Sequence, residues 1–212
     1  MTFTTAYTWG KALADVAGRG IASGNEGSGG QNPRNFKAEY GPSGFDRTHI
    51  FTSSYVYDLP ILKNRADFAG KALGGWTFSG MTVLESGFAF SPGIVGAVGL
   101  AQRPDCVGGV SGPKSLTQWF NTAAFARPGF GFFGNCGTGM IRGPGENAWN
   151  WALYKTFPIK ERMKLQFRSE FFNIWNHPSF DAISASLGAG DFGHVTHALD
   201  PRILEFSLRL QF

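Results

Sequence analysis

The C-terminal segment of the chain, residues 202–212, alternates between two kinds of side chain. One set of alternate positions is apolar and consists of Leu204, Phe206, Leu208, Leu210 and Phe212. The other set is polar and consists of Glu205, Ser207, Arg209 and Gln211. A period of two residues is the pattern of a β-strand whose two faces meet different surroundings. The length of about ten residues and the terminal aromatic side chain are typical of a strand that crosses a bilayer.

We expect the apolar set of this strand to face lipid and its charged residues, Glu205 and Arg209, to face a water-filled lumen. Residues 163–173 repeat the pattern, with Lys164, Arg168 and Glu170 on the polar side. Other segments alternate less regularly, and residues 81–84 interrupt one of them. In total the sequence predicts about six strands, near residues 2–12, 45–58, 75–87, 149–157, 163–173 and 202–212.

The connections between these segments alternate in length. Long, Gly-rich connections are expected over residues 14–44 and 88–148 and before residue 202, and shorter ones near residues 59–74 and 158–161. Outer-membrane barrels have short periplasmic turns and long extracellular loops, so the turn at 158–161 and the C-terminus are expected on the periplasmic side. The predicted fold class is all-β, an antiparallel up-and-down meander that is part of a large transmembrane outer-membrane β-barrel.

The six predicted strands are too few to close a barrel by themselves. Single-chain barrels have at least about eight strands, and open sheet edges would leave backbone groups unpaired in lipid. No signal peptide precedes the first strand, although a barrel protein must be exported. The expectation is therefore a fragment whose missing strands lie upstream, or a barrel that several chains assemble.

Composition excludes two other classes of protein. No stretch approaches the roughly 20 apolar residues of a transmembrane helix, although 42% of the residues are hydrophobic. The net charge is +4, but the Lys and Arg residues are scattered, so no nucleic-acid partner is expected. The 21 Phe and 6 Trp fit lipid-facing bands, and the 30 Gly and 11 Pro fit long loops.

Several short motifs occur in an order that is similar to one family. They are YTWGK at 7–11, FDRTHIF at 45–51, YDLP at 57–60, GGW at 74–76, ESG at 85–87, RGPG at 142–145, FRSEFFN at 167–173, NHP at 176–178 and DPR at 200–202. Together they resemble the C-terminal barrel region of TonB-dependent receptors of the Oar-like type. The resemblance covers nearly the whole chain, 1–212, and rests on the joint order of the motifs.

The resemblance implies a function and a location. These receptors are large proteins in the outer membrane of Gram-negative bacteria, with a regulatory-like domain and a plug upstream of the barrel. It implies a parent barrel of about twenty-two strands, of which this chain supplies the last quarter or so. The implied role is a segment of a transporter that takes part in TonB-dependent uptake. Its implied partners are outer-membrane lipid, the upstream strands and plug and, through the parent, the TonB complex; the ligand is not identified.

The two cysteines, Cys106 and Cys136, fall in the longest expected loop. An oxidising envelope compartment favours a disulfide between them, while free thiols and metal ligation stay open as alternatives. The charges Lys164, Arg168, Glu170, Glu205 and Arg209 are interpreted as a lumen wall with cross-strand ion pairs. The alternative for this set is docking of a plug or steering of a charged substrate.

Other candidate chemistry is weaker, and neither an enzyme, a cofactor nor a metal site is expected. Residues 129–134 fit G-x-G-x-x-G but lack the strand and helix of a dinucleotide site, so an aromatic loop is expected. His194 and His197, with Asp191 and Asp200, do not have the spacing of a metal cluster on one strand face. Two alternatives to transport remain: an adhesive barrel that displays surface loops, and a soluble β-sandwich binding module.

Overall fold

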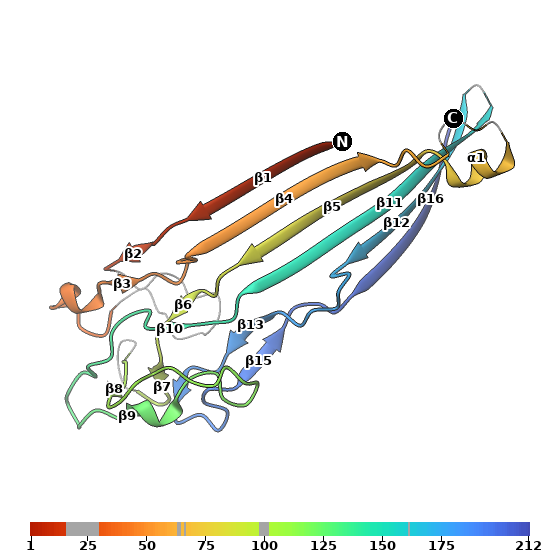
Figure 1. Cartoon of the computed structure of the whole chain (residues 1–212). Coiled ribbons are helices and arrows are strands. Elements are labelled where there is room, and N and C mark those ends of the chain that lie inside the picture. Colours follow the sequence, from red (N-terminus) through yellow and green to blue (C-terminus); the bar gives the residue numbers. More distant parts are fainter. Residues whose placement is uncertain (16–29, 63–64, 66, 98–101, 161) are drawn as a thin grey trace.

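Six long strands form one antiparallel sheet in this computed structural model, which describes residues 1–15, 30–62, 65, 67–97, 102–160 and 162–212. Each strand pairs with the next long strand along the chain (Figure 1). In sheet order they are β1 (Thr2–Trp9), β4 (His49–Asp58), β5 (Trp76–Glu85), β11 (Glu146–Lys160), β12 (Met163–Phe172) and β16 (Ile203–Gln211). The predicted all-β, up-and-down antiparallel fold is confirmed.

Several strand boundaries differ from the expected ones. The predicted turn at 158–161 is wrong in its first three residues, because β11 runs on to Lys160 with a register shift after Pro158. A bulge of this kind accommodates a proline that cannot donate a ladder hydrogen bond. β4 starts only at His49, and β5 continues through the interrupted stretch at 81–84. Because β5 pairs with strands on both sides, its ladder overrides the irregular side-chain pattern.

The connections divide between the two ends of the sheet (Figure 1). Short connections join β4 to β5 and β11 to β12 at the end where the chain finishes. The first of them contains a helix that the sequence did not predict, α1 (Phe68–Leu73). The Asp67 carboxylate accepts a hydrogen bond from the Gly70 N–H (3.0 Å) and so caps the helix.

The three long connections lie together at the opposite end (Figure 1). We call the described residues of 10–48, 86–145 and 173–202 the loop assembly. It contains short elements: β2 (Leu13–Ala14), η1 (Phe36–Glu39), β3 (Gly41–Pro42), β6 (Ala89–Phe90), β7 (Gly93–Ile94), β8 (Asp105–Cys106), η2 (Thr122–Ala124), β9 (Phe125–Ala126), β10 (Ile141–Arg142), β13 (Phe180–Ile183), β14 (Ser186–Leu187) and β15 (Val195–Ala198). The second and third connections join through parallel pairing of β7 with β14.

The main hydrophobic core lies in this loop assembly, not beneath the sheet. Its buried members come from the second and third connections: Phe90, Phe120, Ala124, Phe125, Cys136, Ile141, Ile183 and Ala185. The large sheet, by contrast, has no second sheet stacked on it within the described residues, and Leu208 of β16 is 69% exposed. A soluble sandwich buries such residues between two sheets, so that alternative does not describe this fold.

Candidate functional site

The strand register gives the sheet one apolar and one polar face. Leu165 lies opposite Leu210 and Phe167 opposite Leu208, so the apolar positions of β12 and β16 share a face. Directly opposite residues share a face in the other strand pairs too, so the same face can be followed across all six strands. We call it the apolar face, and it includes Phe3, Tyr7, Trp9, Phe51, Tyr55, Tyr57, Trp76, Phe78, Leu84, Trp149, Trp151, Leu153, Phe157, Leu165, Phe167, Phe171, Leu204, Phe206, Leu208 and Leu210.

Aromatic side chains interlock on this apolar face. The ring of Tyr55 covers Gly80 on the next strand, where an added Cβ would lie 2.5 Å from the ring. The Tyr55 hydroxyl accepts a hydrogen bond of 2.9 Å from the Trp151 indole N–H. Trp151 also meets Phe78 edge to face at 5.4 Å. The glycine gives the tyrosine room to lie flat across the strands, and the polar atoms of both large rings are satisfied.

One charged residue, Lys155, interrupts the apolar face near its α1 end. It lies directly opposite Trp76 on one side and Phe167 on the other, and those two rings meet edge to face at 5.9 Å. Its Nζ donates to the backbone oxygens of Lys71 and Ala72 at 2.5 and 3.0 Å. The ammonium is thus covered by rings and bonded to the last turn of the helix. Sequence alternation missed this contact because only tertiary structure brings α1 to β11.

The polar face carries the predicted lumen charges. Lys164, Arg168 and Glu170 of β12 share it with Glu205 and Arg209 of β16. The described residues of this set do not form the expected cross-strand ion pairs. Arg168 pairs instead with Glu170 of its own strand, at 2.8 Å. Glu170 lies directly opposite Glu205, and Arg168 lies opposite Ser207. A pair this exposed contributes at most about 1 kcal/mol, so these charges set the potential of the surface more than its stability.

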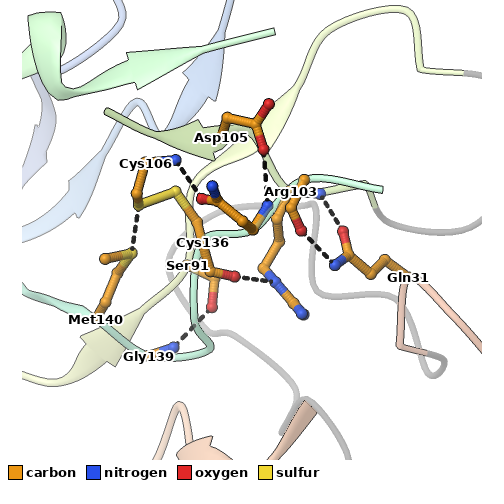
Figure 2. Close-up of a disulfide and its surroundings, with 10 residues drawn as sticks. Gln31, Ser91, Arg103, Asp105, Cys106, Cys136, Gly139 and Met140 are labelled. Atoms are coloured by element: carbon orange, nitrogen blue, oxygen red, sulfur yellow. Dashed lines mark hydrogen bonds between the residues drawn. A yellow bond between two sulfur atoms is a disulfide. The ribbon is translucent and has the colours of Figure 1, made fainter. Parts of the chain in front are cut away.

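The predicted cysteine pair lies inside the loop assembly. The structure joins Cys106 and Cys136 in a disulfide with a Cα–Cα distance of 5.0 Å (Figure 2). Met140 places its sulfur 3.4 Å from that of Cys106. The Asn135 side chain accepts from the Cys106 N–H at 2.7 Å. The bridge therefore ties β8 to the chain that returns toward the sheet.

A buried ion pair joins the first and second long connections beside this bridge. The Arg103 guanidinium pairs with the Glu39 carboxylate, and the two side chains are only 8% and 0% exposed. Arg103 also donates through Nε to the Cys136 carbonyl at 2.8 Å (Figure 2). Gln31 accepts from the Arg103 N–H and donates to the Gly134 carbonyl, at 3.1 and 2.8 Å. This network has no sequence signature, since its members are up to 103 residues apart.

A second ion pair fixes the same two connections closer to the sheet. Arg142 pairs with Asp46, and it also donates to the Asp46 carbonyl at 2.8 Å. Burial opposes ionisation of Asp46, but the Ala12 N–H and the Arg142 guanidinium together hold the pKa of its carboxyl below the ordinary value of 3.8. Arg47, the next residue, pairs with Glu85 at the end of β5, at 3.0 Å. The loops are thus bonded to one another and to the sheet.

The comparison with protein families matches this architecture. The family described as an outer membrane beta barrel domain matches residues 1–205, nearly the whole chain. The chain belongs to this family. Membership places the outer membrane barrel domain in the cell outer membrane, in contact with lipid. Curated proteins and solved structures gave no match. Among the residues that the structure describes, no helix is long and apolar enough to cross a membrane.

The other candidate residues form local contacts within the described part of this outer membrane barrel domain. His197 bonds to Asp181 (Nδ1 to Oδ1, 2.6 Å), whereas the carboxylate of Asp191 accepts from Ser184 at 2.8 Å. No group of three or more metal-ligating His, Cys, Asp or Glu residues occurs in the described part of the chain. Gly129 and Gly131 lie in an exposed loop, with a turn in which the Phe132 N–H donates to the Gly129 carbonyl (3.0 Å), whereas Gly134 is buried beside Gln31.

Proposed function

We propose that this domain is one part of the wall of a large outer-membrane transporter, a TonB-dependent receptor of the Oar-like type, and that it takes part in energy-coupled uptake. In this proposal the apolar face contacts lipid and the polar face lines the lumen. The observation that carries the proposal is a single open sheet with one apolar and one polar face, with all three long connections at one end. The order of the sequence motifs supports the receptor type.

The strand dimensions support a bilayer-spanning wall. β4, β5 and β12 have ten residues each. At about 3.3 Å per residue and a tilt of about 45°, such a strand rises roughly 23 Å. The apolar band of outer-membrane barrels is about 25 Å tall. The α1 end then lies in the periplasm and the loop assembly outside the cell, where an oxidising environment favours the disulfide.

The open edges support a larger barrel. Among the described strands, β1 and β16 each have one neighbour. Lipid cannot satisfy the backbone groups of an open edge, so further strands must pair with both. A barrel of about twenty-two strands has a lumen wide enough for a plug. The lumen charges, including Glu170, Glu205 and Arg209, then face either that plug or the transported ligand.

The internal bonding of the loop assembly supports a role as a gate or as a cap that captures the ligand. A buried ion pair, a second pair whose carboxylate alone is buried, a disulfide and a hydrophobic core hold it as one body. Such a body can move or bind as a unit, whereas separate loops order only on contact.

Conductance of the full-length protein in planar bilayers tests the plugged-transporter proposal. A plugged barrel is expected to conduct little until urea, at a concentration that unfolds the plug but not the barrel, opens it. Glu205→Lys should then shift the ion selectivity of the open pore toward anions. The matched variant Leu204→Thr, on the opposite face, should not. A pore that urea does not open, or an equal shift for both variants, would contradict the proposal.

A second candidate function, adhesion, has one observation in its favour. Phe130 and Phe132 are exposed on the same turn of the loop assembly, and Phe133 follows them. Exposed aromatic residues of this kind are enriched where proteins bind one another. An adhesive barrel needs no energising partner, so whole-cell cross-linking of the full-length protein to TonB discriminates between the functions. Cross-links support transport, and their absence with intact surface adhesion supports the second candidate.

A further inference from the structure

Lys155 and α1 are joined by hydrogen bonds on the apolar face, at the end away from the loop assembly. A lysine on a lipid-facing surface costs roughly 2–4 kcal/mol at the bilayer midplane and far less near its boundary, so its surroundings are informative. Residue Lys155 is 5% exposed, and its ammonium donates to two backbone oxygens at the end of α1. The Trp76 indole N–H donates to the same Ala72 oxygen at 3.3 Å. Two residues of the apolar face thus hold the helix against that face.

Aromatic rings complete the enclosure of this ammonium. The Nζ atom of Lys155 lies 4.8 Å from the centre of the Phe157 ring and 5.9 Å from that of Trp76. Carbonyl oxygens and ring faces both attract a cation, and their effect grows where water is excluded. The charge is therefore compensated on the apolar face itself, and this compensation requires α1 to stay in place.

The helix that is held there exposes large apolar side chains. Phe68 is 86% and Leu73 58% exposed, and Ile61 in the same connection is also exposed. Lys71 adds a positive charge between the two apolar residues of the helix. Phenylalanine, leucine and lysine on a short surface helix are typical of a segment that lies in the headgroup layer of a membrane.

We propose that α1 is an interfacial anchor that lies in the phospholipid headgroup layer at the periplasmic boundary, with Lys155 and Trp76 as its tethers. The proposal rests on the proposed function, because it requires the apolar face to contact lipid. The surface of α1 is continuous with that face through Trp76, so the same bilayer that covers the sheet reaches the helix. Phe68 and Leu73 insert below the headgroups, and Lys71 lies among the phosphates.

Spin-label accessibility in the full-length protein, reconstituted in phospholipid vesicles, tests this placement. Cys106 and Cys136 of this domain are paired, so here an introduced cysteine takes the label. For Phe68→Cys the ratio of collisions with oxygen to collisions with a water-soluble nickel complex should be several-fold above that for Phe130→Cys. Phe130 is also a highly exposed phenylalanine, but it lies in the loop assembly. Leu208→Cys reports whether the apolar face meets lipid.

The outcomes separate the two proposals. A lipid-like ratio at both 208 and 68 supports the anchor. A lipid-like ratio at 208 with an aqueous ratio at 68, or with a label at 68 that neither reagent reaches, overturns the anchor alone. An aqueous ratio at 208 overturns the lipid-facing assignment and the anchor together.

The tether is tested in the same labelled protein. Lys155→Met should lower the lipid-like ratio at 68 toward the aqueous value while the ratio at 208 stays unchanged, because the helix loses its carbonyl contacts. Lys164→Met removes a lysine from the polar face and should change neither ratio. An unchanged ratio at 68 in Lys155→Met, with 208 still in lipid, would overturn the role of Lys155 as tether.

Discussion

Leu208 of β16 lies directly opposite Phe167 of β12, and the next residue, Ser207, lies opposite Arg168 on the other face. Neighbouring positions in one strand therefore belong to surfaces of opposite character. A slip of one residue would exchange the two faces, so the apolar residues of both strands specify the register together.

This relationship predicts unequal effects of one substitution at two adjacent positions. Leu208→Arg places a charge on the proposed lipid face and should destabilise the full-length barrel by roughly 2–4 kcal/mol. Ser207→Arg, on the polar face, should cost far less. Urea titration of both variants after refolding into lipid vesicles measures the difference. Equal losses would mean that the two faces meet the same environment.

The close approach of Tyr55 to Gly80 predicts that Gly80→Ala destabilises the sheet. The added Cβ would lie 2.5 Å from the tyrosine ring, which would have to leave its contact with Trp151. Such overpacking typically costs about 1–3 kcal/mol, more than the roughly 0.5–1 kcal/mol that alanine gains over glycine in a strand. The free energy of unfolding in vesicles is the measurement.

Two matched variants identify the cause of that loss. Gly10→Ala, where no atom lies within 4 Å of the added Cβ, should be neutral or slightly stabilising. In a Tyr55→Ala background the loss at Gly80 should disappear, because the clashing ring is absent. A loss that persists without the ring would point to backbone strain instead.

The long strands and their faces could be predicted from the sequence because alternation is a local signal. Residues 163–173 and 202–212 both show it, and the structure pairs β12 with β16. The helix could not be predicted in this way. Six residues are too few for a clear helical period, and isolated helices of that length are unstable, so α1 depends on its Asp67 cap and on contacts with Lys155.

The organisation of the loop assembly could not be predicted either. Its core brings together residues as far apart as Phe90 and Ile183, and its ion pairs join residues 64 and 96 positions apart. No periodicity marks such contacts, since they depend on how long connections fold onto each other. The disulfide could be expected from the sequence because two cysteines in one loop have few possible roles. Arg103 and Glu39, in contrast, resemble ordinary surface charges in the sequence.

The buried Arg103–Glu39 pair predicts a large penalty when one partner is removed. Glu39→Leu leaves the guanidinium buried without its carboxylate and should destabilise the loop assembly by about 3–5 kcal/mol. The double variant Glu39→Leu with Arg103→Met should recover much of this loss, because no unpaired charge remains. Native-state hydrogen exchange of the loop amides measures the free energy of opening.

An exposed pair serves as the control for that experiment. Arg168→Ala removes the partner of Glu170 on β12, where both side chains are partly exposed, and should cost at most about 1 kcal/mol. If the double variant were as unstable as Glu39→Leu alone, the hydrogen bonds from Arg103 to Cys136 and Ala38 would be the larger contribution.

The Asp46–Arg142 pair predicts that the loop assembly weakens in acid. Burial favours the neutral carboxyl, but the Ala12 N–H and Arg142 outweigh it, so the pKa of Asp46 in the folded protein lies below its ordinary value of 3.8. A carboxyl whose pKa is lower in the folded than in the unfolded protein stabilises the folded state fully at pH values above its unfolded-state pKa. This contribution is lost as the pH falls through the folded-state pKa. Wild-type protein should therefore lose loop stability below about pH 4.

Trp119 offers a local probe, because its indole N–H donates to the Arg142 carbonyl at 2.8 Å. In protein labelled with fluorotryptophan, its ¹⁹F resonance, assigned with Trp119→Phe, should report the unfolding midpoint in urea at each pH. Asp46→Asn should lower the midpoint at neutral pH and flatten its dependence on pH in the acid range, because the titrating group is gone. His197→Asn leaves the Asp46 carboxylate in place, so it should leave the acid dependence intact. The same acid loss in Asp46→Asn as in wild type would assign the transition to another carboxylate.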